Sequence, residues 1–208
     1  MLPATISRSA ITSFSLALVF AAAALAQNPS SSPTAPAQTP SAPATSAAPA
    51  APKIEDQASF TVVGVTVRTN NATEAGQQGK IPQLWESVMQ NGTLEQIPNK
   101  DGDALVVVYS DYASDNTGDY NYTLGYKVTS ADKIPDGMVA RTIHAGKYAA
   151  LNSDQGPPQE VIGALWQRIN SMTPQQLGGT RAYQTDFETY DQVTNWNDMH
   201  MTAHIGLK

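Results

Sequence analysis

The chain has 208 residues, enough for one domain or two small ones, and its 18 acidic and 12 basic residues give a net charge of −6. An acidic chain without a stripe of lysine and arginine is poorly suited to neutralise phosphates, so we expect no nucleic-acid partner. The absence of cysteine excludes disulfides, thiolate metal sites and cysteine nucleophiles. We expect no cofactor either, because the sequence has no phosphate-binding loop, nucleophile elbow or HExxH motif.

Residues 1–26 have the pattern of a secretory signal peptide. Arg8 is their single charge, an apolar stretch covers residues 14–24, and Ala24-Leu25-Ala26 fits a small-x-small cleavage site. A membrane anchor is the alternative, but this stretch is shorter than the roughly 20 residues that span a bilayer. We therefore expect cleavage after Ala26, export (to a bacterial periplasm, which we favour) and no membrane insertion of the mature protein.

The segment 27–57 is predicted to be a disordered linker. Its residues 27–52 include seven prolines and no charged or large apolar side chain. Such a segment cannot bury enough surface to offset the entropy of ordering it.

The folded part is predicted to be residues 58–208, and it contains an internal repeat. At an offset of 81 residues, Leu84-Trp85 matches Leu165-Trp166, and Tyr109 matches Tyr190. Segments 61–62 and 142–143, and 124–127 and 205–208, also match at this offset. We interpret this as two copies of one structural unit.

Each unit shows the same order of hydrophobic patterns, read in chain order. The first has a strand-like run at 60–67, an amphipathic helix over 81–89, and strand-like runs at 104–109 and 122–128. The second repeats this order at 138–151, 162–169, 183–190 and 199–207. The sequence thus predicts an α+β fold: two βαββ repeats related by a pseudo-two-fold axis, forming an antiparallel sheet of about eight strands packed by two helices.

Two groups of polar residues could be metal ligands by residue type, but the spacing of their side chains does not favour a metal site. The segment 111–119 contains three aspartates, but their spacing is not that of a calcium loop, so we expect a polar hairpin turn. His200 and His204 lie four apart in a predicted strand, which separates them by about 13 Å. We expect no metal site, and a structural or solvated role for His144.

Glu188 is the unusual residue of the repeat. It interrupts an apolar and aromatic strand, whereas the matching position in the first unit is Val107. The period of two puts Asp186, Glu188 and Tyr190 on one face of that strand. Either Glu188 has a function in a cleft, or it is a carboxylate on a solvent-facing strand.

Several short segments resemble the GyrI-like, or AraC-type, effector-binding domain over about residues 58–208. They are Ile81-Pro82-Gln83-Leu84-Trp85, Asp119-Tyr120-Asn121-Tyr122, Ile134-Pro135-Asp136-Gly137-Met138, Ile143-His144-Ala145-Gly146-Lys147-Tyr148, Leu165-Trp166 and Phe187-Glu188-Thr189-Tyr190. The resemblance implies the same tandem fold, with a cleft between the repeats that binds amphipathic and often cationic molecules.

By this resemblance Glu188 is the charged residue of the cleft, and five aromatic residues become candidates to line it. A buried carboxylate lacks solvation, a cation would supply its partner, and aromatic faces attract cations. Each ring has the alternative role of ordinary core packing. The candidates are Trp85, Trp166, Tyr109, Tyr148 and Tyr190.

Two functions of different classes follow. The first is an exported, stand-alone protein that binds hydrophobic or cationic amphipathic molecules; without a helix-turn-helix ahead of the cleft, direct transcriptional control is not expected. The alternative is a hydrolase of small strained or ester-like substrates, in which Glu188 activates water. Binding of a protein partner is a weaker third option.

Overall fold

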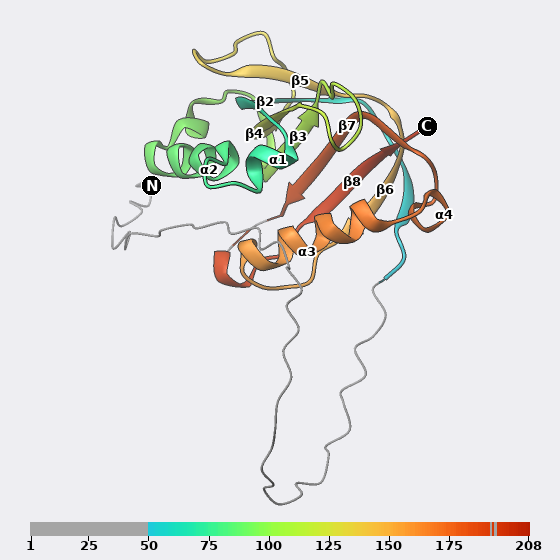
Figure 1. The fold of residues 1–208 in the computed structure, drawn as a ribbon. Helices are drawn as coiled ribbons and strands as arrows, with labels where there is room; N and C mark the ends of the chain where they lie inside the picture. Colours follow the sequence, from blue (N-terminus) through green and yellow to red (C-terminus); the bar gives the residue numbers. More distant parts are fainter. Residues whose placement is uncertain (1–49, 192, 194) are drawn as a thin grey trace, which may run out of the picture.

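The computed structural model describes residues 50–191, 193 and 195–208; the predicted signal peptide and most of the predicted linker lie outside these residues. Eight antiparallel strands form one sheet, and helices pack against it (Figure 1). The strands are β1 (Lys53–Gln57), β2 (Phe60–Thr69), β3 (Lys100–Ser110), β4 (Tyr120–Val128), β5 (Val139–Ile143), β6 (Gly146–Asn152), β7 (Arg181–Tyr190) and β8 (Thr202–Leu207). The helices are α1 (Asn71–Glu74), α2 (Lys80–Asn91), α3 (Pro158–Ser171) and α4 (Pro174–Leu177), with 3-10 turns η1 (Thr93–Gln96) and η2 (Trp196–Asp198).

The strand order has the symmetry that a duplication predicts. It runs β1-β6-β8-β7-β3-β4-β2-β5, so each strand and its counterpart in the other repeat lie at equal distances from the centre. At that centre β3 pairs with β7, and Val107 lies directly opposite Glu188. The pseudo-two-fold axis therefore passes between these two residues. The predicted α+β fold with two related halves is confirmed.

The uniform offset of 81 residues holds at the centre of the sheet and is wrong for its outer strands. β1 and β5 begin 86 residues apart, at Lys53 and Val139. On the other side, Val107 pairs with Leu124 while its counterpart Glu188 pairs with Ala203, which is 79 residues after Leu124. Connections of different length between the elements account for the change.

The sheet has the predicted number of strands, but each repeat begins with one strand more than a βαββ unit contains. Residues 138–151 form two strands, because β5 joins the edge of β2 while β6 pairs with β8. Correspondingly, residues 53–57 are not linker but strand β1, which pairs with β6. The sequence does not reveal β1 because Lys53, Glu55 and Asp56 interrupt any apolar alternation; its backbone hydrogen bonds hold it at the edge.

The helices begin and end at residues suited to those positions. The buried carboxylate of Glu74 accepts hydrogen bonds from the backbone N–H groups of Lys80 and Ile81 at the first turn of α2, at 3.0 and 3.1 Å. These donors have no partner inside the helix, so the side chain acts as its cap. Gly92 ends α2 in the left-handed conformation.

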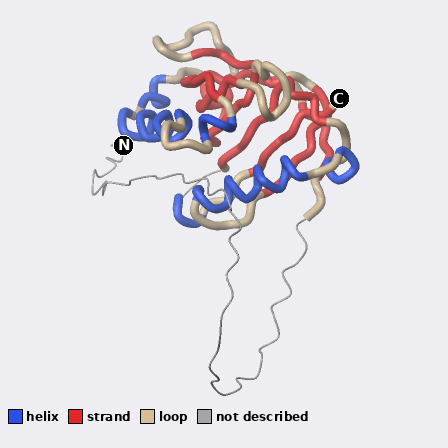
Figure 2. The backbone as a smooth tube through the Cα atoms, viewed as in Figure 1, coloured by secondary structure: helices blue, strands red, loops and turns tan. Residues whose placement is uncertain are grey.

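Hydrophobic side chains cover both faces of the sheet. The larger cluster lies between the sheet and one side of α2 and α3, which cover the same face (Figure 2), and it contains Leu84, Val88, Leu165 and Ile169. The smaller cluster, on the opposite face, comprises Val62, Val106, Val108, Ile143, Tyr148 and Phe187. In the part of the chain that the structure describes, no helix combines the length and the apolar character needed to cross a bilayer.

Candidate functional site

Glu188 lies at the centre of the helix-covered face and has no exposed surface. Its Oε1 accepts hydrogen bonds from the Tyr109 hydroxyl at 2.9 Å and from the Trp166 indole N–H at 2.5 Å. Its Oε2 accepts one from the Tyr190 hydroxyl at 2.7 Å. Each donor comes from a different element, β3, α3 and β7, so the site forms only when sheet and helix are assembled.

Aromatic rings surround this carboxylate. The rings of Tyr109 and Trp166 have centroids 4.9 Å apart, and Tyr109 also contacts Tyr120 and Tyr122 at 5.4 and 5.2 Å. These separations are those of favourable aromatic pairs. We call the rings of Trp85, Tyr109, Tyr120, Tyr122, Trp166 and Tyr190 the aromatic cluster.

Trp85 and Trp166 occupy matching places on α2 and α3 but bond to different acceptors. The Trp85 indole N–H donates to the Tyr122 hydroxyl at 2.7 Å, whereas that of Trp166 donates to Glu188. Trp85 also packs edge-on against Tyr190 at 5.5 Å. The two pseudo-symmetric halves thus differ in charge beneath their tryptophans: the acceptor is a carboxylate in the second half and a neutral hydroxyl in the first.

Trp196 extends the cluster to the surface. Its ring packs against Trp85 at 5.7 Å and Tyr190 at 6.3 Å, and 37% of it is exposed. It comes from η2 in the connection between β7 and β8. Sequence reasoning missed Trp196, although a large aromatic residue within a polar connection was a usable signal.

The environment sets the protonation of the groups in the cluster. Burial raises the pKa of the Glu188 carboxyl, and the hydrogen bonds from Trp166, Tyr190 and Tyr109 oppose that rise. Burial, followed by the charge of Glu188, raises the pKa of Tyr109 and Tyr190 well above the usual value for tyrosine. Both phenols therefore remain neutral donors.

A buried ion pair lies beside the cluster. The Arg181 guanidinium bonds Asp186 Oδ2 through Nη2 at 2.7 Å and through Nε at 3.2 Å. The Tyr112 hydroxyl donates to the same oxygen at 2.6 Å, and the backbone N–H of Gly206 donates to Oδ1 at 2.8 Å. Arg181 also lies over the Trp166 ring, 5.4 Å from its centroid.

Five of the six residues named from the sequence come together in this site. Tyr148 does not, because it belongs to the cluster on the opposite face of the sheet. Its hydroxyl bonds Thr185 Oγ1 at 2.9 Å, and its ring packs on Phe187. The five are Glu188, Trp85, Trp166, Tyr109 and Tyr190. Tyr120 and Tyr122, which sequence reasoning missed, could be found from the hairpin pairing that sets Tyr122 opposite Tyr109.

The other polar features are accounted for by contacts within the chain. His204 bonds Glu55 through Nδ1 at 2.9 Å and stacks on Phe187 at 4.2 Å. In the 111–119 connection, Asp115 accepts hydrogen bonds from the backbone and hydroxyl of Thr117, as expected of a hairpin turn. Within the described residues, no three potential ligands gather into a metal-binding group.

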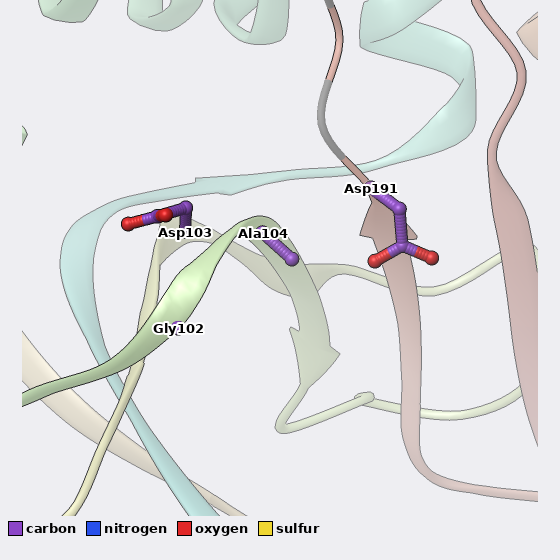
Figure 3. Close-up of a pocket in the computed structure, with 4 residues that line it drawn as sticks. All are labelled: Gly102, Asp103, Ala104 and Asp191. Carbon is purple, nitrogen blue, oxygen red and sulfur yellow. The ribbon is translucent and has the colours of Figure 1, made fainter.

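A hollow lies beside the beginning of β3 and the end of β7, lined by Gly102, Asp103, Ala104 and Asp191 (Figure 3). The carboxylate of Asp103 points away from that of Asp191, so the two acids do not converge on a common point. We assign no function to this hollow.

Comparison with known proteins identifies the family whose sequence model the chain matches. The sequence model of the Cass2 family, described as integron-associated effector-binding proteins, matches residues 53–204. Bacillus subtilis YobU is 28% identical over 130 residues, which cover 62% of this chain and 79% of YobU. The transcriptional regulator BrlR of Pseudomonas aeruginosa is 29% identical over 140 residues, 67% of this chain but only 48% of BrlR.

Solved structures share the fold. An integron cassette protein from the mobile metagenome of Vibrio cholerae has a TM-score of 0.61 and 25% identity, covering 76% of this chain and 96% of its own. SAV2435, solved bound to tetraphenylphosphonium, also has a TM-score of 0.61, with 16% identity, covering 76% and 93% of the two chains. The resemblance to GyrI-like effector-binding domains is thereby confirmed.

Proposed function

Because the chain belongs to the family of integron-associated effector-binding proteins, we propose that it is an exported protein that binds hydrophobic or cationic amphipathic small molecules. The proposed site is the aromatic cluster, with Glu188 as the charge partner of a cationic ligand. One observation carries this proposal. Glu188 is a fully buried carboxylate whose partners are all neutral.

The other two buried carboxylates show how unusual this is. Asp186 is paired with the Arg181 guanidinium. Glu74 lies at the amino end of α2, where the helix dipole presents a partial positive charge. Among the ion pairs of the described residues, none includes Glu188, so its charge is stabilised by hydrogen bonds alone. A buried charge without a counter-charge is costly, and a ligand cation would remove that cost.

The rings around Glu188 suit such a ligand. Each aromatic face that a cation contacts contributes about 0.5–2 kcal/mol, and the apolar parts of an amphipathic ligand gain by leaving water. Trp166 and Tyr109 contact the carboxylate directly, and Trp85 packs against Tyr190, which also bonds it. The cluster thus combines one negative charge with several ring faces.

Access requires the rings to move. Glu188, Tyr109 and Tyr190 are buried, while Trp85 and Trp166 are half-buried and Trp196 is partly exposed. A ligand entering from the surface therefore meets the tryptophans first and must displace them to reach the carboxylate. We propose that the ligand enters between α2 and α3 by displacing the side chains of Trp85 and Trp166.

A related fold supports the choice of ligand class. SAV2435, which has the same fold at 16% identity, was solved with tetraphenylphosphonium, a bulky hydrophobic cation. This shows that the fold can accommodate such a cation, and it makes tetraphenylphosphonium a suitable probe here.

Export is the second part of the proposal, and it rests on the signal-like pattern of residues 1–26. Expression of the full chain in a Gram-negative host should give a periplasmic protein that begins at Gln27. Intact mass and amino-terminal sequencing measure this directly. A chain that keeps Met1 and stays with the membranes would contradict export without affecting the proposed ligand site.

The binding site is tested by calorimetry with tetraphenylphosphonium on the wild type and on Glu188→Gln. Glutamine keeps the shape of the side chain and removes its charge, so affinity should fall about thirtyfold or more, equivalent to roughly 2–5 kcal/mol. The neutral analogue triphenylphosphine oxide should be affected much less. Glu86→Gln, which removes the same charge from an exposed position on α2, is the matched control and should bind as the wild type.

Equal affinity of wild type and Glu188→Gln for the cation would refute the proposal. The same proteins also test the hydrolase alternative with a panel of aryl esters. Protein donors already use three of about four acceptor positions of Glu188, which leaves little room for a water to be activated. Turnover that is abolished in Glu188→Gln while substrate affinity survives would favour the hydrolase instead.

A further inference from the structure

Arg181 already occupies a cation site built like the one proposed for the ligand. Its guanidinium carbon lies 4.6 Å from the ring centroid of Tyr183, 5.4 Å from that of Trp166 and 5.8 Å from that of Tyr112. Its charge partner is the fully buried Asp186. We call these three rings and the Asp186 carboxylate the Arg181 cage; it shares Trp166 with the aromatic cluster.

The backbone conformation of Tyr183 indicates that the Arg181 cage is maintained at a cost in conformational free energy. Tyr183 has φ 52°, in the left-handed region that an aromatic residue rarely adopts. The equivalent position of the first repeat, 81 residues earlier, is Gly102 with φ 98°, where glycine adopts this conformation freely. The second repeat therefore carries a strained tyrosine where the first has a glycine, and the ring it gains is the one closest to Arg181.

The irregular backbone around Tyr183 also determines the position of Arg181. The pairing of β7 with β8 shifts register between Arg181 and Asp186, and that of β3 with β4 shifts between Lys100 and Leu105. Lys100 is thus the counterpart of Arg181, but it lies over the ring of Tyr126, 4.2 Å away. Both repeats contain this bulge. The second repeat adds a buried acid, Asp186, that is paired with a cation surrounded by aromatic rings, Arg181.

We infer that Arg181 fills a second cation site beside Glu188 and thereby restricts the ligand to a single positive charge. This inference rests on the proposed function of Glu188. Asp186 and Glu188 are two residues apart on one strand face, so their carboxylates lie about 7 Å apart. Arg181 neutralises the first and leaves one uncompensated negative charge for the ligand. A second ligand charge at that spacing would meet the guanidinium and be repelled.

The test compares two ligands that differ in one charge. Benzyltrimethylammonium is the monocation, and its para-bis(trimethylammoniomethyl)benzene analogue is the dication with a charge separation close to that of the two carboxylates. Calorimetry gives the ratio of their affinities. In the wild type the monocation should bind more tightly; Arg181→Met, which leaves two negative charges, should shift the ratio at least tenfold toward the dication.

Two further variants complete the charge series. Arg181→Met/Asp186→Asn again leaves a single negative charge, so its ratio should return to that of the wild type. Asp186→Asn alone frees Arg181 to compete for Glu188, so the affinity for the monocation should fall at least tenfold. This variant decides the question if Arg181→Met does not fold.

The outcomes separate the two proposals. A wild type that binds neither benzyltrimethylammonium nor tetraphenylphosphonium would refute the proposed function. A wild type that binds the monocation, together with an unchanged affinity ratio in folded Arg181→Met, would refute only the role of Arg181. With no folded Arg181→Met, unchanged monocation binding by Asp186→Asn would refute it equally.

Discussion

The two tryptophans of the repeats provide an internally controlled test of the charge on Glu188. Trp166→Phe and Trp85→Phe each keep an aromatic ring on the sheet-facing side of a helix and remove one indole N–H. In Trp166→Phe the lost hydrogen bond goes to the carboxylate; in Trp85→Phe it goes to the neutral Tyr122 hydroxyl. The two side chains are similarly half-buried, so the losses of packing are comparable, and phenylalanine at position 166 keeps an aromatic face beside Arg181.

The difference between the two acceptors determines how much more Trp166→Phe should destabilise the protein than Trp85→Phe. A hydrogen bond to a charged group contributes about 1.5–3 kcal/mol, and one between neutral groups about 0.5–1.5 kcal/mol. Trp166→Phe should therefore lower the free energy of unfolding by roughly 1–2 kcal/mol more than Trp85→Phe does at neutral pH. For a folded domain of this size, that difference lowers Tm by a further 2–8 °C or so.

The difference should also depend on pH with a defined sign. Burial raises the pKa of Glu188 in the folded state above its value in the unfolded chain, so its charge destabilises the protein fully above the folded pKa. This cost shrinks as pH falls below the folded pKa and is gone below the unfolded pKa. The Trp166 hydrogen bond favours the charged form. Its extra contribution is therefore present above the folded pKa of Glu188 and lost below it, and the two variants should converge in acid.

Urea unfolding of both variants and the wild type, followed by circular dichroism at several pH values, measures both effects. Circular dichroism is suitable because it does not depend on the replaced indoles. Equal destabilisation by the two substitutions at neutral pH, or a gap that stays constant on acidification, would refute the assignment of a buried ionised carboxylate at Glu188.

Three other substitutions test parts of the fold. Glu74→Ala removes the cap of α2 and should cost about 1–2 kcal/mol in urea unfolding, against less than about 0.5 kcal/mol for the exposed Glu86→Ala. Gly125→Ala would drive a methyl group into the Val63 carbonyl of the neighbouring strand; it should cost roughly 3 kcal/mol or prevent folding, whereas Gly146→Ala, which meets open space, should be nearly neutral in the same assay. Tyr183→Ala keeps the left-handed backbone without the ring and should be about 1 kcal/mol less stable than Tyr183→Gly; equal stabilities would mean that the backbone there is unstrained.

Much of the fold followed from the sequence because its helices and central strands carry strong patterns. The apolar face of α2, the matching face of α3 and the alternation along β7 are local properties, and each specifies one buried side. The alternation also predicted correctly that Glu188 and Tyr190 share a face. The edge strand β1 escaped prediction because its stability comes from pairing with β6 rather than from its own composition.

Tyr148 shows why part of the site could not be predicted. The resemblance names Tyr148 as a candidate but does not fix the face of the sheet on which it lies. The repeat does not correct this, because successive residues of a strand point to opposite faces and an offset wrong by an odd number of residues exchanges the two faces. The offset of the first strands is 86 residues rather than 81, an odd difference. The pairing of Arg181 with Asp186 was hidden for a related reason, because a backbone bulge at Tyr183 breaks the alternation between them.

The position of Glu188 beside the pseudo-two-fold axis has a consequence for how a lone carboxyl group can be placed there. In an assembly of two identical chains, a residue that faces its own copy across the axis must occur twice or not at all. Two carboxylates in direct cross-strand contact inside an apolar core would repel each other strongly. Joining both halves in one polypeptide lets Val107 face Glu188. The covalent link between the repeats therefore lets one carboxyl group stand opposite an apolar side chain at the centre of the molecule, where a symmetric dimer of half-length chains would place two carboxyl groups in contact.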